Sequence, residues 1–163
     1  MVEHLNDIAG IRLICSFMSD IYPIADMIAR QADITVLHVK DYIKYPKANG
    51  YKSYHMVVTI PVYLSEGKRD TKVEIQIRTI AMDFWASLEH KIAYKFEGKA
   101  PDYLERELKS CADMVDMLDM KMFSLNQAIM AVEEEERRRE EEKRREREKA
   151  ERKLEELAGN GPK

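Results

Sequence analysis

The chain contains the stretch Val73-Glu74-Ile75-Gln76-Ile77-Arg78-Thr79, in which a single carboxylate, Glu74, lies in a predicted β-strand among the apolar residues Val73, Ile75 and Ile77. Burial of a carboxylate among apolar neighbours is costly unless a metal ion or a cation compensates it. A lone carboxylate of this kind suits a metal site or a proton transfer. An exposed Glu on an edge strand is the more common arrangement, so the spacing alone leaves both interpretations open.

A second stretch, Lys47-Ala48-Asn49-Gly50-Tyr51-Lys52-Ser53-Tyr54-His55, surrounds one turn glycine with cationic, amide, aromatic and imidazole groups. Lysines around a glycine turn can neutralise a triphosphate, and backbone N–H groups near Gly50 add donors. Tyr51 offers a face to a purine ring, and His55 can point into the same cleft. For the charges alone, a solvated loop is the simpler interpretation. Together the two stretches favour a nucleotide-processing site. The lysines of this region are Lys40, Lys44, Lys47 and Lys52.

The first hundred residues alternate between strand and helix patterns. We expect strands at 8–17, 34–45, 53–63 and 71–78, helices at 19–30 and 81–96, and a hairpin-like turn at 66–70. The first strand is expected to be buried, the first helix to be capped by Ser19 or Asp20, and the second helix to end at Gly98. The predicted fold class is α+β, with a single mixed β-sheet flanked by helices and a long C-terminal helix.

A long helix is predicted after Pro101, because no further Gly or Pro occurs before Gly159. Its apolar residues form a heptad seam, which Met114 and Met117 widen. We expect one side of this helix to pack on the domain and its methionine-rich side to pack on another copy of the chain. Packing on the domain alone is the alternative. The seam consists of Leu104, Leu108, Cys111, Val115, Leu118, Met122, Leu125, Ile129 and Val132.

The last part of the chain, 133–163, consists mainly of Glu, Arg and Lys at helical spacing, with 12 acidic and 11 basic residues. Glu-to-Arg pairs four residues apart, such as Glu135 and Arg139, each stabilise a helix by about 0.2–0.5 kcal/mol. We therefore expect a solvated helix with a short tail, or a frayed end without a role. The predicted division is a core at 1–100, an amphipathic helix at 101–132 and this charged segment at 133–163.

Composition excludes several classes of protein. The net charge of −3 gives the whole chain no electrostatic footprint for DNA, and RNA is not indicated as a partner although it stays open. No apolar run is long enough to span a bilayer, and no signal-peptide pattern is present. Cys15 and Cys111 lie in apolar-patterned segments and suit a reducing cytosol. We expect a cytoplasmic protein. The remaining histidines, His4, His38 and His90, lack the spacing of a zinc site.

Three ordered motifs resemble the synthetase domain of the RelA/SpoT alarmone family: residues 7–12, 45–55 and 74–79. The segment 82–95 is similar to the helix that follows the Glu strand in that family. The short length and the heptad-bearing C-terminal helix are most similar to the single-domain small alarmone synthetases. The resemblance covers about residues 3–130 and implies a nucleotidyltransferase-like synthetase fold.

The resemblance implies pyrophosphoryl transfer, in which the 3′-hydroxyl of GTP or GDP attacks the β-phosphorus of ATP. The products are a guanosine tetra- or pentaphosphate and AMP. Such a transfer needs positioning and charge neutralisation more than covalent help. By this resemblance Asp7 holds Mg²⁺, and Glu74 binds the metal or draws the proton from the 3′-hydroxyl. Two carboxylates with few other ligands suit Mg²⁺, which leaves most of its shell to water and phosphates.

The remaining implied roles concern the guanosine nucleotide. Tyr51 would stack on guanine, with Lys47 and Asn49 along its edge or ribose. Lys40, Lys52 and His55 would meet the guanosine phosphates. Related sequences often have Asn where this chain has Asp83. A carboxylate there can accept from both N1–H and the 2-amino group of guanine.

One departure from the family concerns ATP. In the family, a basic segment before the Asp motif holds the adenosine and its phosphates, whereas here only six residues precede Asp7. The ATP-binding residues are therefore expected to be mostly absent from this chain. We expect it to bind guanosine nucleotide and to synthesise little alarmone. A guanine-nucleotide-binding or oligomer-forming module without synthetase activity is the main alternative. A relative acting on another 3′-hydroxyl, such as an RNA end, is a third.

Overall fold

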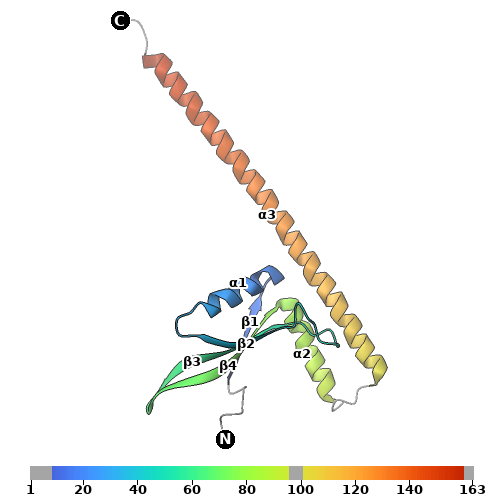
Figure 1. Ribbon diagram of the computed structural model, residues 1–163. Coiled ribbons are helices and arrows are strands. Elements are labelled where there is room, and N and C mark those ends of the chain that lie inside the picture. The colour runs from blue at the N-terminus through green and yellow to red at the C-terminus, as the bar shows by residue number, and fades with distance from the viewer. Residues whose placement is uncertain (1–8, 96–100, 160–163) are drawn as a thin grey trace. The chain divides into compact units, whose positions relative to one another are not determined.

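The computed structural model describes residues 9–95 and 101–159. By their internal contacts the residues form two compact units, Met1–Phe123 and Ser124–Lys163. The elements follow one another as β1 (Ala9–Cys15), α1 (Met18–Ala29), β2 (Thr35–Asp41), β3 (Tyr54–Leu64), β4 (Gly67–Thr79), α2 (Ile80–Lys95) and α3 (Asp102–Gly159). Figure 1 shows this order along the chain.

The four strands form one mixed sheet in the order β1-β4-β3-β2 (Figure 1). The pair of β1 and β4 is parallel, while β3 pairs antiparallel with both β4 and β2. A parallel pair needs a crossover connection, whereas β3 and β4 join through a hairpin. The α+β fold with a single mixed sheet is thereby confirmed. Glu74 lies on β4, an internal strand, so the edge-strand interpretation of this carboxylate is wrong.

Strand β4 separates the apolar core from a polar face by simple alternation. Val73, Ile75 and Ile77 are buried in one cluster with Ile21 and Ala25 of α1. Each fully buried aliphatic side chain contributes about 1.5–3 kcal/mol. The alternate residues, at 74, 76 and 78, carry polar side chains and point to the opposite face because strand side chains alternate. A register slip of one residue would exchange the two faces, so the apolar set fixes where the polar set lies.

Strand β1 is less buried than its sequence predicts. Ile11 and Ile14 are each 46% exposed, while Cys15 is buried and Leu13 packs partly against the core. Ile14 lies on the face opposite the core, because side chains alternate along a strand, whereas Ile11 shares the face of Leu13 and Cys15 but lies on an edge strand. The prediction of a buried first strand is therefore wrong for half of its apolar residues.

The β3–β4 turn is shorter than the sequence predicts, whereas Asp20, one of the two predicted caps of α1, does cap this helix. Gly67 already pairs with Leu64, so the β3–β4 connection is Ser65-Glu66, and the residues predicted as a turn at 67–70 belong to β4. Gly67 has a φ of 117°, which glycine adopts readily. At α1, the carboxylate of Asp20 accepts from the backbone N–H of Phe17 at 3.1 Å, so Asp20 caps from the third helical position. The expected end of α2 at Gly98 lies outside the described residues.

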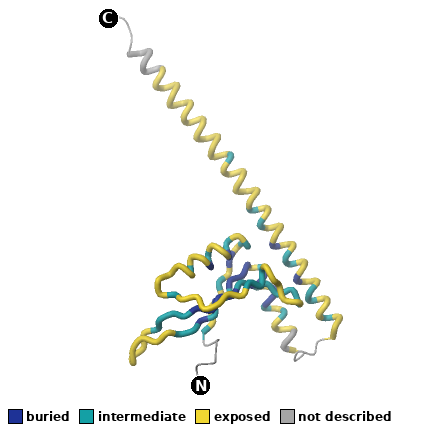
Figure 2. Tube along the Cα trace, in the orientation of Figure 1, coloured by how far each residue is buried: buried dark blue, intermediate teal, exposed yellow. Residues whose placement is uncertain are grey.

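Within the first unit, α3 packs on the domain by one side only (Figure 2). Ala112 and Asp119 are buried on this side, and Val115 is partly buried. Met114 and Met117 are exposed by 56% and 68%. The described part of α3 thus contacts the domain through Ala112 and Asp119, neither of which belongs to the predicted seam. None of the helices in the described part of the chain has the length and apolarity needed to cross a membrane.

The second unit consists of the helical residues 124–159. None of the side chains described for 124–153 is buried (Figure 2). Glu135 accepts from Arg139 at 3.1 Å, which confirms one predicted pair, and it also pairs with Arg138. Arg144 lies 3.7 Å from Glu148. The helix is thus stabilised by neighbours three or four residues away on its own surface.

Candidate functional site

A polar row crosses all four strands on the sheet face opposite the core of α1. The register places Arg12 of β1 beside Gln76 of β4, Gln76 beside His55 of β3, and His55 beside Lys40 of β2. Because paired residues point to the same face, these four side chains start from one line across the sheet. Glu74 and Arg78 flank Gln76 on β4 at the spacing of two that keeps them on the same face.

The loop between β2 and β3 carries Tyr51 above this row, and its own hydrogen bonds fix its shape. The N–H of Gly50 donates to the carbonyl of Lys47 at 2.9 Å, and the N–H of Lys47 donates to the carbonyl of Tyr51 at 3.2 Å. The side chain of Asn49 accepts from the N–H of Tyr51 at 3.1 Å. Gly50 has a φ of 88°, in the region that side chains disfavour, which explains glycine at the turn.

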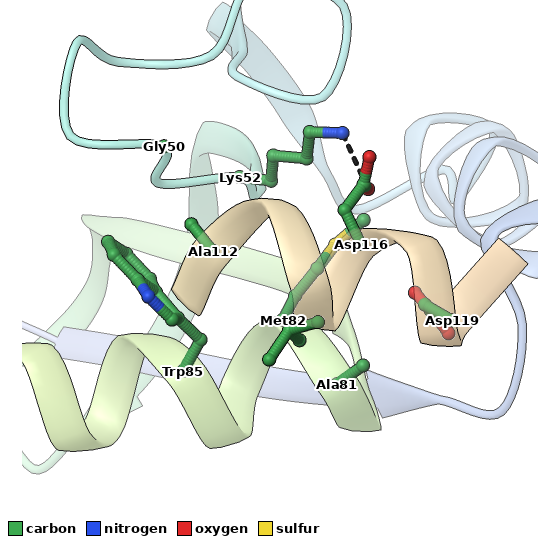
Figure 3. A pocket seen from close by; sticks show the side chains of 9 residues that line it. Gly50, Lys52, Ala81, Met82, Trp85, Ala112, Asp116 and Asp119 are labelled. Atoms are coloured by element: carbon green, nitrogen blue, oxygen red, sulfur yellow. Dashed lines mark hydrogen bonds and ion pairs between the residues drawn. The ribbon is translucent and has the colours of Figure 1, made fainter. Parts of the chain in front are cut away.

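Helix α3 contacts this loop directly, and α2 packs against α3 (Figure 3). A Cβ on Gly50 would lie 2.5 Å from the Cβ of Ala112, so the loop backbone touches α3 directly. Lys52 Nζ lies 2.6 Å from Asp116 Oδ1 on the same helix. The indole N–H of Trp85 donates to the carbonyl of Leu108 at 3.1 Å and joins α2 to α3. The small pocket drawn in Figure 3 encloses about 20 Å³, room for about one water molecule, and is therefore a packing seam.

Cations and aromatic rings surround Tyr51. Lys47 Nζ lies 4.8 Å from the centre of the Tyr51 ring and 5.1 Å from that of Tyr42. The guanidinium carbon of Arg78 lies 5.2 Å from the Tyr51 ring centre. Cations at these distances are attracted by the ring faces. The loop lysine that sequence reasoning placed beside the purine site is thus held next to the proposed stacking ring.

A chain of hydrogen bonds joins Tyr51 to Glu74 through His55. The Tyr51 hydroxyl lies 2.8 Å from His55 Nε2, and His55 Nδ1 lies 3.0 Å from Glu74 Oε1. An ionised carboxylate only accepts, so Nδ1 carries the hydrogen and a neutral imidazole leaves Nε2 as the acceptor. The hydroxyl of Tyr51 therefore donates to His55, and His55 donates to Glu74.

The pKa shifts of the two titratable groups agree with these roles. Burial lowers the pKa of His55; the carboxylate of Glu74 opposes this effect, while the charges of Arg78 and Lys47 add to it. Burial raises the pKa of Glu74, but hydrogen bonds from Gln76 and His55 and the charge of Lys40 more than offset it, so the net shift is downward. At neutral pH the site thus holds a neutral imidazole beside an ionised carboxylate.

Arg78 is buried at the centre of the site. Its Nη2 donates to the Tyr51 hydroxyl at 2.6 Å and to Gln76 Oε1 at 2.7 Å, and its Nε donates to the hydroxyl of Ser53 at 3.2 Å. Its Nη1 lies 3.1 Å from Asp83 Oδ1, which also pairs with Arg12 at 3.1 Å. Asp83, the residue that sequence reasoning assigned to guanine, thus holds two arginines in place.

An open cleft of about 650 Å³ lies beside Tyr51, within the size range of small-ligand sites. Its lining includes three predicted residues on the loop, Lys47, Asn49 and Tyr51, together with His55 on β3. The opposite wall belongs to α2, where Glu89 accepts from the Asn49 amide at 3.3 Å. The lining residues that sequence reasoning missed are Arg12, Gln76, Arg78, Ala86, Ser87, Glu89, His90 and Lys91.

The other predicted residues lie around this cleft or beyond the described part. Lys40 lies in the polar row, and Lys52 points to Asp116 on α3. Asp7 lies outside the described residues. Arg78 and Gln76 could have been found from their spacing of two from Glu74, which places all three on one face. Contacts such as Lys52 with Asp116, 64 positions apart, have no local signal.

Among the described residues, Glu74 is the carboxylate best placed to bind Mg²⁺, and the remaining ligands would have to come from elsewhere. No group of three His, Cys, Asp or Glu side chains that could hold a metal is found among residues 9–95 and 101–159. Glu74 is half-buried and stays ionised, because its pKa is lowered. Mg²⁺ is commonly held by one or two carboxylates together with substrate phosphates, so the donor chemistry fits this ion.

Comparisons with known proteins agree with the geometry. A family model described as the region found in RelA / SpoT proteins matches residues 1–99. The chain is 50% identical over 129 residues to GTP pyrophosphokinase YwaC of Bacillus subtilis (strain 168), an alignment that covers 79% of this chain and 61% of that protein. The chain therefore spans about three fifths of the length of this relative.

Solved structures show the same fold. The crystal structure of small alarmone synthetase 2 from Bacillus subtilis matches with a TM-score of 0.75 and 50% identity, over 77% of this chain and 68% of that chain. Small alarmone synthetase 1 from Bacillus subtilis, bound to its product pppGpp, matches with a TM-score of 0.73 and 39% identity, over 75% of this chain and 63% of that chain. At 50% and 39% identity, the two proteins resemble this chain in sequence as well as in fold.

Proposed function

The chain belongs to the RelA/SpoT family, and on this premise we propose that it serves pyrophosphoryl transfer from ATP to the 3′-hydroxyl of GTP or GDP. The products are a guanosine penta- or tetraphosphate and AMP. The observation that carries the proposal is the hydrogen-bonded chain from the Tyr51 ring, beside an open cleft, to the ionised carboxylate of Glu74. The relatives' names, GTP pyrophosphokinase and small alarmone synthetase, support the same reaction.

The acceptor nucleotide is proposed to lie in the cleft beside Tyr51. Guanine stacks on the Tyr51 ring, and the ammonium of Lys47, 4.8 Å from the ring centre, lies along the base or ribose. Stacking of a base on an aromatic ring contributes about 1–3 kcal/mol. Asn49 acts mainly through the loop, because its side chain accepts from the Tyr51 N–H and donates to Glu89. The loop is thereby ordered before the nucleotide arrives, which lowers the cost of binding.

Glu74 is proposed either to bind the metal ion or to draw the proton from the 3′-hydroxyl. His55 donates to Oε1 at 3.0 Å and Gln76 donates to Oε2 at 3.0 Å, so both oxygens are oriented. Each carboxylate oxygen keeps a further lone pair for a metal ion or a hydroxyl proton. A fixed orientation matters because in-line transfer depends on placing the reacting groups correctly.

We propose Mg²⁺ as the cofactor, held by Glu74 and Asp7 together with nucleotide phosphates. When bound, this ion neutralises charge on the phosphates of the transferred group. Lys40 and His55 are proposed to face the guanosine phosphates from the polar row. Lys52 is proposed to do so by exchanging its partner Asp116, 2.6 Å away, for a phosphate oxygen. Lys52 therefore gains less from phosphate than a free lysine would.

We also propose that the protein is cytoplasmic and forms a homo-oligomer through α3. Apolar side chains on the outward side of this helix are exposed, with Met120 at 57% and Leu118 at 59%. Exposed apolar residues that gather on one element are typical of an interface. Sedimentation of the chain at several concentrations is the test, and a monomer throughout would contradict the proposal.

The experiment on function has two arms. Calorimetric titration with GDP and with ADP tests the acceptor site, and we expect GDP to bind more tightly. In the second arm, γ-labelled ATP is incubated with GTP and Mg²⁺, and labelled guanosine nucleotides are resolved by anion exchange. We expect Glu74→Gln to abolish labelled product and Glu66→Gln, an exposed Glu in the β3–β4 turn, to leave it unchanged.

The outcomes separate the candidate functions. If the wild-type chain forms labelled product, an equal amount from the Glu74→Gln chain would contradict the role of Glu74. Binding of GDP without any labelled product would favour a guanine-nucleotide-binding module that does not carry out the transfer. Equal or weaker binding of GDP relative to ADP would contradict the acceptor site itself.

A further inference from the structure

Five side chains of the site form a closed ring of hydrogen bonds. Arg78 Nη2 donates to Tyr51, whose hydroxyl donates to His55, and His55 donates to Glu74 Oε1. On the other side Arg78 Nη2 donates to Gln76 Oε1, and Gln76 Nε2 donates to Glu74 Oε2. Every distance in the ring lies between 2.6 and 3.0 Å. The ring begins at one arginine nitrogen and ends on the two oxygens of one carboxylate.

We infer that Arg78 is a positioning residue, which through this ring holds the stacking face of Tyr51 and the reactive carboxylate of Glu74 in one fixed arrangement. The inference deepens the proposed function and rests on it for the roles of Tyr51 and Glu74. The existence of the ring rests on geometry alone. Arg78 acts through these two side chains and needs no contact with the nucleotide.

The burial of Arg78 makes its position well determined. It is 4% exposed, and a buried guanidinium must be paired and hydrogen-bonded to avoid a large desolvation cost. Four of its five N–H groups are engaged, two of them in the ring and the others with Ser53 and Asp83. Nη1 pairs with Asp83, which Arg12 shares, so the Nη2 group stays available for the ring. The side chain cannot rotate without breaking several of these bonds.

The shape of the guanidinium explains why arginine is suited to this position. Its planar fork presents donors in fixed directions, whereas lysine presents a compact ammonium on a flexible stem. A lysine at 78 would keep the positive charge but would lose the simultaneous contacts with Ser53, Asp83, Tyr51 and Gln76. Arg78→Lys therefore separates the geometric role from the role of charge.

The alternative is that Arg78 only supports the fold through Ser53 and Asp83. The two interpretations differ in how variants combine. Tyr51 and Gln76 accept from the same Nη2 and begin opposite arms of the ring. If the ring acts as a unit, a variant that breaks the hydrogen bonds on one side removes most of the contribution of the other side to GDP affinity and stability. The effects of two variants are then not additive. Separate contacts would give additive effects.

The test uses the full chain with Arg78→Lys, Tyr51→Phe, Gln76→Met and their pairwise combinations. Arg69→Lys, an exposed arginine on the same strand, is the matched control. The first arm needs no nucleotide and measures the urea midpoint of unfolding for each variant. The second arm measures GDP affinity by calorimetry. Tyr51→Phe keeps the ring face, so any loss reports the hydroxyl and its partners.

We expect each ring variant to lower GDP affinity roughly tenfold, the size expected for a charge-assisted hydrogen bond. The GDP affinity of each double variant should be only slightly lower than that of its weaker-binding single variant. The affinity of Arg69→Lys should match the wild type. Urea midpoints should show the same lack of additivity. If Arg78→Lys does not fold, the pair Tyr51→Phe with Gln76→Met still decides the question.

Additive urea midpoints would show that the ring does not act as a unit and would overturn the inference. Unchanged GDP affinity in folded Arg78→Lys would confine this residue to a structural role and would also overturn it. Failure of the wild-type chain to bind GDP would instead refute the proposed function, and the urea midpoints would still decide whether the ring exists.

Discussion

The loop at 47–55 and the charged helix at 133–153 are both rich in cationic residues, but the two regions use their charges differently. In the helix, Glu135 pairs with Arg138 and Arg139, three and four positions away. In the loop, Lys52 pairs with Asp116, 64 positions away, and Lys47 lies over two aromatic rings. Local pairs stabilise one helix, whereas distant partners fix a cation beside a cleft. The number of positions between a charged residue and its partner therefore distinguishes the site from the solvated surface in this chain.

The largest effect is expected where the loop touches α3. In Gly50→Ala the new Cβ would lie 2.5 Å from Ala112, at a φ of 88°. The backbone strain and the clash together should cost about 2–4 kcal/mol of unfolding free energy. GDP affinity should fall as well, because the loop carries Tyr51. Urea unfolding and calorimetry measure the two effects.

Gly67→Ala is the matched control for this prediction. Its φ is 117°, but no atom lies within 4 Å of the added Cβ. The unfolding free energy should fall only by the cost of backbone strain, about 1–2 kcal/mol, and GDP affinity should not change. Equal losses in the two variants would show that contact with α3 does not shape the loop.

The next effect concerns the stacking ring. Tyr51→Ala should weaken GDP binding by about 1–3 kcal/mol, because the base loses its aromatic partner. Tyr45→Ala is a suitable control, since Tyr45 is 70% exposed and lies 5.6 Å from Lys44, a similar pair outside the cleft. Calorimetry at constant ionic strength makes the comparison. Equal affinities of the two folded variants would rule out stacking on Tyr51.

A smaller effect is expected from the buried imidazole. Burial lowers the pKa of His55 in the folded chain, so as pH falls below about 6.5 the unfolded chain takes up the proton first. The contribution of His55 to stability is fully present above that pH and is lost as pH falls toward the folded-state pKa. The slope is at most about 1.4 kcal/mol per pH unit.

Denaturant unfolding between pH 7.5 and 5.5 checks this slope. His55→Asn should remove it, while His38→Asn, at an exposed position on β2, should retain it. The comparison between variants cancels the contribution of other titrating groups. A slope that persists in His55→Asn would assign the pH dependence to a different residue.

The smallest effect is expected in the charged helix. Glu135→Gln removes two surface pairs, each of which contributes about 0.2–0.5 kcal/mol to the helix. Helix content measured by circular dichroism should fall slightly, and more at low salt than at high salt. GDP affinity should not change. A loss of GDP affinity would show that this segment contributes to the nucleotide site after all.

The alternation of apolar and polar residues predicted most of the fold. Val73, Ile75 and Ile77 define the buried face of β4, and this pattern alone places Glu74 on the opposite face. The pattern failed at Gly67-Lys68-Arg69-Asp70, whose residues are typical of turns. There, pairing with β3 outweighs local preference, and such pairing depends on a partner strand rather than on the segment itself.

The site was predicted as a set of residues but not as a network. Tyr51, His55 and Glu74 were identified by their chemistry, and the structure joins them by hydrogen bonds. Arg78 had no assigned role, because its partners lie on the β2–β3 loop, on its own strand β4 and at the start of α2. Asp83 was assigned to guanine, yet it holds Arg12 and Arg78. Such partnerships depend on how distant elements pack, which local sequence does not encode.

A crystal structure of the chain with GDP and Mg²⁺ would show whether Tyr51 and Glu74 hold the acceptor nucleotide. We expect guanine to stack on the Tyr51 ring, with the ribose 3′-oxygen within hydrogen-bond reach of Glu74 or of a Mg²⁺ ion that Glu74 holds. The hydrogen bonds that join Arg78, Tyr51, His55, Glu74 and Gln76 in a ring should persist when the nucleotide is present. A nucleotide bound elsewhere, or a 3′-oxygen directed away from Glu74, would refute the proposed roles of Tyr51 and Glu74.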